Sequence, residues 1–242
     1  TTEAIILGGE AAVTEDVEAQ LLAAMGAGST VDRIAGADRY ETAREVAARA
    51  ITELGGAFDG IAFVATGANF PDALAAGPIA AAAGMPIYLV SNTAGDAATL
   101  GAMVADGVSY ANVLGGEAVV TSSTFGDLES EFGAGRVRRL AGENRYETAA
   151  EVATFGVEMA KLGWDGVGIA TGEAFPDALA AGATLARFDT VLVLSRPASL
   201  PTETGSVLSL NRMAIDDVHY FGGLGALSAD VRAAVQQIVE AP

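Results

Sequence analysis

The sequence predicts an α/β protein built from tandem modules, each an open, mainly parallel sheet of about four strands flanked by helices. Two observations support this fold class. The 242 residues contain sequence boxes that recur in a fixed order, and each box reads as a short apolar strand that runs into a helix. The repeat length of roughly a hundred residues suits a small domain rather than a solenoid unit.

The first box, called the Gly-Gly box below, occurs three times. Its copies are ILGGEAAVT (6–14), VLGGEAVVT (113–121) and YFGGLGALS (220–228). Their first glycines, spaced by 107 residues, are Gly8, Gly115 and Gly222. The apolar run predicts a strand, the glycines predict a turn, and a hydroxyl side chain after them predicts the N-cap of a helix. The predicted N-caps are Thr14, Ser122 and Ser228.

The second box, the Arg box, occurs twice. Its copies are RIAGADRYETA (33–43) and RLAGENRYETA (139–149). Apolar residues in and after each copy recur at i, i+3, i+4 and i+7, which predicts a helix with one apolar face. Asp38 and Asn144 stand three residues before Glu41 and Glu147, which is the spacing of a capping box. Both copies therefore predict a helix that begins at the same position of the box.

The third box, the Pro-Asp box, also occurs twice. Its copies are ATGANFPDALAAG (65–77) and ATGEAFPDALAAG (170–182), identical at eleven of thirteen positions. The preceding run IAFVAT predicts a strand buried on both faces, Gly67 ends it, and Pro71 suits the first turn of a helix. The small residues let that helix lie very close to a neighbour. PIYLV or TVLVL then predicts a fourth strand, followed in the first copy by a helix near 96–105.

These boxes divide the chain into three expected parts. The Gly-Gly box occurs once more than the other two, so residues 1–31 read as a strand–helix remnant of a preceding repeat. Residues 32–135 form the first expected module and residues 136–242 the second.

Composition excludes several classes of function. The net charge is −18, with 31 acidic against 13 basic residues, and such a field repels nucleic acid. Cysteine is absent, which excludes a disulfide, a thiolate metal site and a cysteine nucleophile. The single histidine, His219, is not kept by the repeat, and no metal or cofactor motif is complete. Residues 73–95 carry no charge, but Pro78 and Pro86 interrupt them, which indicates a helix and a buried strand rather than a membrane span.

Candidate binding residues lie where the predicted strands end, because ligands of open α/β sheets bind at that edge. The candidates are Arg33, Arg39, Asp72, Arg139, Arg145 and Asp177. We expect unsatisfied N–H groups of nearby helix N-termini to attract an anion there together with the arginines. The alternative is structural: Arg39 pairs with Asp72, and Arg145 pairs with Asp177, to lock helix onto loop.

The three boxes, in this order and spacing, resemble the type 2 cell-wall-binding repeat of bacterial surface proteins over nearly the whole chain. The resemblance implies Rossmann-like modules packed around a pseudo-threefold axis, and an extracellular, non-catalytic protein that anchors to the cell envelope. The implied partners are an anionic cell-wall polysaccharide and other repeat modules of the same family. The family's aliphatic run, implicated in anchoring, falls on Ile87–Val90 and Val191–Leu194.

Two alternative functions stay open at this point. A hydrolase of wall carbohydrate would use paired carboxyl groups, with Asp72 or Asp177 facing Glu41 or Glu147. A surface-layer assembly unit would bind only other protein modules.

Overall fold

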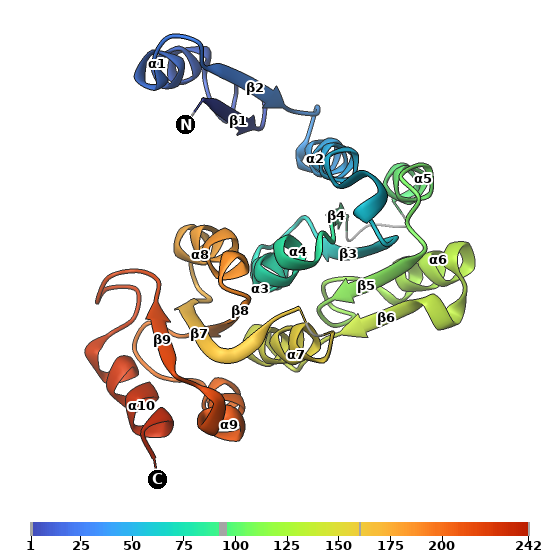
Figure 1. Cartoon of the computed structure of the whole chain (residues 1–242). Coiled ribbons are helices and arrows are strands. Elements are labelled where there is room, and N and C mark those ends of the chain that lie inside the picture. Colours follow the sequence, from blue (N-terminus) through green and yellow to red (C-terminus); the bar gives the residue numbers. More distant parts are fainter. Residues whose placement is uncertain (1, 92–95, 160, 242) are drawn as a thin grey trace.

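The computed structural model describes residues 2–91, 96–159 and 161–241, and within these ranges every strand pair is parallel (Figure 1). The strands form three sheets, which we call sheets A, B and C. The strands are β1 (Glu3–Leu7), β2 (Thr30–Ile34), β3 (Ile61–Thr66), β4 (Ile87–Val90), β5 (Tyr110–Leu114), β6 (Val137–Leu140), β7 (Gly163–Thr171), β8 (Thr190–Ser195) and β9 (Asp217–Tyr220). The α/β fold class predicted from the sequence is confirmed.

The helices alternate with the strands along the chain. They are α1 (Glu15–Met25), α2 (Arg39–Leu54), α3 (Pro71–Ala75), α4 (Gly77–Ala83), α5 (Ala97–Ala105), α6 (Ser122–Phe132), α7 (Arg145–Glu158), α8 (Phe175–Arg187), α9 (Thr202–Asn211) and α10 (Ala229–Val239). Short 3-10 turns follow α2, α6 and α9, at Gly55–Ala57, Ala134–Arg136 and Arg212–Ala214.

The strand order shows that the three sheets derive from one repeating unit. Sheet A has the order β1-β2, sheet B has β4-β3-β5-β6, and sheet C has β8-β7-β9. Because β1, β5 and β9 all come from Gly-Gly boxes, the three sheets are partial or complete copies of one four-stranded unit. Sheet B contains all four strands in the described residues.

The Arg boxes join the sheets that precede them. Strand β2 pairs with β1, and β6 pairs with β5. The expected boundary after residue 31 therefore falls inside β2, and the one after residue 135 falls between two paired strands of sheet B. The division into a remnant and two modules stays a prediction, whereas the pairing is a property of the fold.

The helix starts follow from local hydrogen bonds. The Oδ1 of Asp38 accepts from the Glu41 N–H at 2.8 Å, and the Glu41 carboxylate accepts from the Ala37 N–H at 2.6 Å. The predicted cap at Ser122 is wrong by one residue, because the Thr121 hydroxyl accepts from the Thr124 N–H. The side-chain caps after the three Gly-Gly turns thus keep the 107-residue spacing, at Thr14, Thr121 and Ser228.

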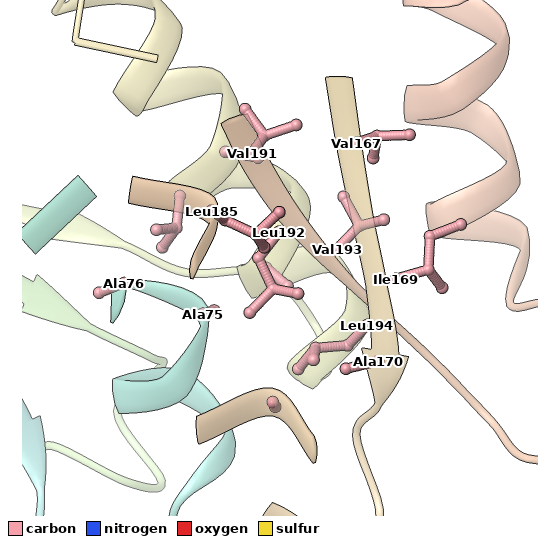
Figure 2. Close-up of a cluster of buried hydrophobic side chains, with 14 of the residues drawn as sticks. Ala75, Ala76, Val167, Ile169, Ala170, Leu185, Val191, Leu192, Val193 and Leu194 are labelled. Carbon is pink, nitrogen blue, oxygen red and sulfur yellow. The ribbon is translucent and has the colours of Figure 1, made fainter. Parts of the chain in front are cut away.

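One apolar core runs through both repeats. Ala75, Ala76 and Ile79, from the α3–α4 segment of the first repeat, are at most 3% exposed and belong to the same buried cluster as α7 and β8 of the second repeat. Figure 2 shows Ala75 and Ala76 near Leu185 and Leu192. The small side chains of the Pro-Asp box make this close packing possible. A Cβ on Gly77 would lie 3.2 Å from the Cα of Gly182, so two glycines meet where α4 crosses α8.

The uncharged stretch of residues 73–95 forms helix and strand, as the sequence predicts, over the part that the structure describes. Residues 73–91 contribute to α3, α4 and β4, while residues 92–95 lie outside the described residues. Among the described helices, none combines the length and apolar character needed to cross a membrane.

Gly172→Val should lower the free energy of unfolding by about 1–3 kcal/mol through overpacking. A Cβ on Gly172 already lies 3.0 Å from the Tyr146 ring, and Tyr146 is buried and cannot swing away. A Cβ on Gly67 would overlap the equivalent ring of Tyr40, closer than Gly172 comes to Tyr146, but Tyr40 is partly exposed and its ring can shift outward, so we expect a smaller loss. Urea denaturation of each variant measures the change.

Gly101→Ala is the control for these variants. Its position lies inside α5 with open space around it, so we expect a gain of about 0.5–1 kcal/mol from reduced chain entropy. Unchanged stability of both valine variants would contradict a packing role for the Pro-Asp box glycines.

Candidate functional site

The candidate site is a small cavity at the junction between the two repeats. It encloses about 160 Å³ and is bounded by the start of α3, the Gly-Gly turn after β5 and the start of α7. Its polar side chains are those of Asn69, Asp72, Glu143, Asn144, Arg145 and Thr148. The first two come from the first repeat and the others from the second, so the cavity exists only when the repeats pack together.

Asp72 is the central acidic group of this cavity. Burial raises the pKa of its carboxyl group, and the positive charge of Arg145 offsets part of this rise. The carboxylate lies directly against Gly115, whose φ is +89°, and a Cβ at that glycine would overlap it. Glycine is therefore required at position 115 for both backbone conformation and space.

The expected pairing of Arg39 with Asp72 and of Arg145 with Asp177 is wrong. No ion pair joins either couple among the described residues. Asp72 of the first repeat faces Arg145 of the second instead. The reason is topological, because α3 lies over the Gly-Gly turn and the next Arg box follows that turn along the chain.

The candidate arginines hold the backbone at strand ends. Arg39 and Arg145 donate through Nη1 to the carbonyls of Gly67 and Gly172, at 2.7 and 2.5 Å. Arg33 and Arg139 donate in the same way to Gly8 and Gly115, each at 2.7 Å. Each of these bonds connects an Arg box to a glycine-containing turn and fixes the guanidinium close to the edge of a sheet.

Arg33 and Arg139 have further neighbours. Arg33 forms an ion pair with Glu18 at 2.6 Å. Arg139 stacks on the ring of Phe125, with 4.7 Å from its Cζ to the ring centre, and burial lowers its pKa. Asp177 lies against Gly222, as Asp72 lies against Gly115. The structure therefore brings Asp72 and Arg145 together at the cavity. The other four candidates lie at other glycine-containing turns, and they are Arg33, Arg39, Arg139 and Asp177.

The N-termini of α2 and α7 do not offer unsatisfied N–H groups in the way the sequence suggested. Asn144 accepts through Oδ1 from the N–H groups of Tyr146 and Glu147, and Glu147 accepts from the Glu143 N–H at 2.6 Å. Asp38 and Glu41 act in the same way at α2. The starts of α3 and α8, at the Pro-Asp boxes, have no such side-chain cap, so the expected N–H groups are at those two helices rather than at α2 and α7.

Sequence reasoning missed several residues of the junctions. Asn144 lines the cavity and donates from Nδ2 to Glu203 at 2.6 Å, although the repeat marks it only as a helix cap. Arg232 donates from Nη2 to the Gly222 carbonyl at 2.9 Å. No repeat signal indicates this arginine, because Glu18 and Phe125 stand at the corresponding positions.

The chain belongs to the cell wall binding domain 2 (CWB2) family, whose model matches residues 33–125 and 139–232. The resemblance seen in the three boxes is thereby confirmed. As a member, the chain is a cell-wall-associated binding module with tandem repeats, found at the cell surface.

Several known proteins are similar to this chain. The amidase enhancer of Bacillus subtilis (strain 168) is 27% identical over 227 residues, covering 94% of this chain and 28% of the enhancer. Cwp8 from Clostridium difficile has a TM-score of 0.79 at 24% identity, over 98% of this chain and 38% of that one. Cwp6 from the same organism has a TM-score of 0.78 at 19% identity, over 97% and 36%. The chain thus spans well under half the length of these proteins, and the two structures support the fold.

Arg145→Gln should make stability more dependent on pH. When folding raises the pKa of a carboxyl group, the folded protein loses stability as the pH rises from the ordinary pKa of that group, here 3.8, through its raised pKa. Without Arg145 the pKa of Asp72 rises further, so the loss between pH 4 and 7 grows by about 1.4 kcal/mol per added pKa unit. Urea denaturation at several pH values between 4 and 7 measures this loss of unfolding free energy for the variant and the parent protein.

Two variants control this measurement. Asp72→Asn, combined with Arg145→Gln, should remove the added pH dependence. Arg39→Gln loses the equivalent bond to a glycine carbonyl but should leave the pH profile of Asp72 unchanged. A profile for Arg145→Gln that runs parallel to that of the parent protein would show that the two charges do not interact.

Proposed function

We propose that the protein is a non-catalytic module that anchors a surface protein to the cell envelope by binding an anionic wall polysaccharide. The observation that carries this proposal is that both repeats match the CWB2 family and meet at a polar cavity that contains an arginine. Catalysis is not needed for such a role, whereas a rigid surface with repeated polar contacts is.

The cavity has suitable chemistry for a sugar polymer. Asn69 and Asp72 supply oxygen acceptors for hydroxyl groups, and Arg145 supplies a cation for a carboxylate or phosphate. Arg145 uses Nη1 for the Gly172 carbonyl, and its remaining nitrogens make no further hydrogen bond among the described residues. Arg39 is held in the same way and is exposed, so it provides a second contact that adds avidity.

The other candidates complete the proposed surface. Arg33, Arg139 and Asp177 lie at the corresponding turns and are proposed as outer contacts. The net charge of −18 opposes an anionic ligand at long range, but salt screens exposed charges beyond about 8–10 Å. Recognition therefore depends on these local groups rather than on the overall field.

The positions of Glu41 and Glu147 argue against the acid pairs that were expected for a hydrolase. A glycosidase requires two carboxyl groups about 5–9 Å apart across a sugar cleft. Glu41 and Glu147, the expected partners of Asp72 and Asp177, accept hydrogen bonds from the backbone at the start of their own helices. This capping supports a structural task for both residues.

Arg39→Gln combined with Arg145→Gln should weaken binding to isolated cell walls about ten- to a hundredfold, because two charge-assisted contacts are lost. Co-sedimentation with walls measures binding, and circular dichroism first checks that each variant is folded. Arg49→Gln is the control, because it removes the same charge from an exposed cluster with Asp32 and Glu53 and should bind like the parent.

The same assay separates the alternatives. Walls stripped of their anionic polymer should no longer retain the parent protein. Release of soluble sugar would identify a hydrolase, and no sedimentation with intact walls would support an assembly unit. A folded double variant that binds as tightly as the parent would reject the arginine site.

A further inference from the structure

A group of charged side chains surrounds Tyr146 at the carboxyl edge of sheet C, beside the junction cavity. Arg145 and Tyr146 begin α7, and Glu203 lies in the first turn of α9. Glu173 and Arg196 follow the ends of strands β7 and β8. Ligands of parallel sheets bind at this edge. We call these five residues the Tyr146 shelf.

The two arginines of the shelf are held around one ring. Arg196 lies over the ring of Tyr146, with 4.7 Å from its Cζ to the ring centre. Arg145 donates to the Gly172 carbonyl. A Cβ on Gly172 would lie 3.1 Å from Arg145 Cδ and 3.0 Å from the Tyr146 ring, so both side chains pack closely against this glycine. The guanidinium of Arg196 forms no ion pair with any residue that the structure describes.

The shelf carries charges of both signs that do not pair with one another. Burial raises the pKa of Tyr146, and the negative charges of Glu173 and Glu203 raise it further. The positive charges of Arg196 and Arg145 lower it. All four charges therefore act on one hydroxyl group, which itself makes no hydrogen bond within the described residues. Opposite charges elsewhere in that part of the chain approach to 2.6–3.9 Å, but none of these ion pairs joins shelf residues.

Local hydrogen bonds keep the acids and bases of the shelf apart. Glu203 accepts from its own N–H and, at 2.6 Å, from Nδ2 of Asn144. These bonds lower the pKa of Glu203, and the charge of Arg196 adds a smaller effect. The N–H of Glu173 donates to the Thr171 hydroxyl at 3.2 Å, which fixes the backbone and leaves the exposed carboxylate free. The charges are thus positioned around an open space instead of neutralising one another.

Most of the shelf charges are specific to the second repeat. Arg145 and Tyr146 have identical counterparts in the first repeat, Arg39 and Tyr40. The other three shelf residues have no charged counterpart there. They are Glu173, Arg196 and Glu203, which stand where the first repeat has Ala68, Asn92 and Ala98. Because the first repeat folds without these three charges, the fold does not require them.

We propose that the Tyr146 shelf binds a compact zwitterionic group, of the kind that an amino acid carries. Its anionic oxygen atoms bind Arg145 and Arg196, and its ammonium group binds the carboxylates of Glu173 and Glu203. The Tyr146 hydroxyl supplies a further hydrogen bond. A purely anionic ligand would meet two carboxylates, and a purely cationic ligand would meet two guanidinium groups. Only a group with both charges satisfies all four side chains.

This ligand class goes beyond the proposed binding of an anionic polysaccharide at the junction cavity. Two sources share the required chemistry. One is a free amino acid, and the other is an amino acid that is attached to the wall with its amino and carboxyl groups free. The site is therefore tested first with a small probe in the absence of walls.

Titration with alanine, followed by NMR of the 15N-labelled protein, tests the shelf. Alanine should shift the signals of the Arg196 Nε–H and the Glu173 amide with a Kd of about 1–10 mM, the strength of a few polar contacts on an open surface. N-acetylalanine lacks the ammonium group and alanine amide lacks the carboxylate. Each should bind at least about tenfold more weakly than alanine, because one pair of charged contacts is lost.

Variants make the result specific to the shelf. Arg196→Gln and Glu173→Gln should each weaken alanine binding about tenfold. Tyr146→Phe keeps the ring under Arg196 and should weaken it about threefold, through loss of the hydroxyl alone. Arg136→Gln is the matched control, because Arg136 lies over the ring of Tyr110 at 5.4 Å and precedes the amino end of a strand of sheet B. It loses the same charge and should bind alanine like the parent.

Two outcomes would overturn the proposal. The first is the absence of shifts at the shelf with alanine at about 50 mM, well above the expected Kd. The second is binding of N-acetylalanine as tight as that of alanine, which would make the shelf a simple anion site. Both readouts are made without cell walls, so they stand apart from the test of the polysaccharide site.

Walls with acetylated amino groups then identify the source of the ligand. Acetylation removes ammonium charges and leaves the anionic groups in place. Weaker co-sedimentation of the parent with acetylated walls, together with no such difference for Glu173→Gln, would support a zwitterion attached to the wall. Alanine binding combined with unchanged co-sedimentation would support a free amino acid as the ligand of the shelf.

Discussion

The burial of the first repeat's α3–α4 segment against α7 and β8 of the second is the contact on which the rest of the structure depends. It joins two sheets through one apolar core and brings Gly77 of α4 against Gly182 of α8. The same contact places Asp72 beside Arg145 and creates the polar cavity. Small residues suit the Pro-Asp box because larger side chains at the crossing of Gly77 and Gly182 would push the two helices apart.

Arginine has a structural task that repeats along the chain. Carbonyl groups at the ends of strands need donors, and glycine turns provide few side chains to supply them. Arg33 and Arg139 serve two successive Gly-Gly turns in this way. At the third turn Arg232 of α10 serves the Gly222 carbonyl. A guanidinium can hold a carbonyl with one nitrogen and still present others outward, which allows one residue to combine support with binding.

The recurring boxes, spaced by 105 to 107 residues, allowed most strands, helices and caps to be predicted from the sequence, because most elements are visible in two or three copies. The period shows which residues are equivalent, but it does not show which copy each one contacts. That is why Asp72 was paired with Arg39 of its own repeat rather than with Arg145 of the next. Arg232 was missed for a related reason, since its contact is made by a residue type that occurs in one copy only.

The shared core also has a mechanical consequence. In the anchoring role proposed above, tension acts between the wall-bound surface and an attached protein, and resistance to force depends on the rate of unfolding. Repeats joined by loose linkers would yield one after another. Here the α3–α4 segment cannot leave α7 and β8 without opening the core of the second repeat. We therefore expect the two repeats to share the load and to unfold cooperatively under it.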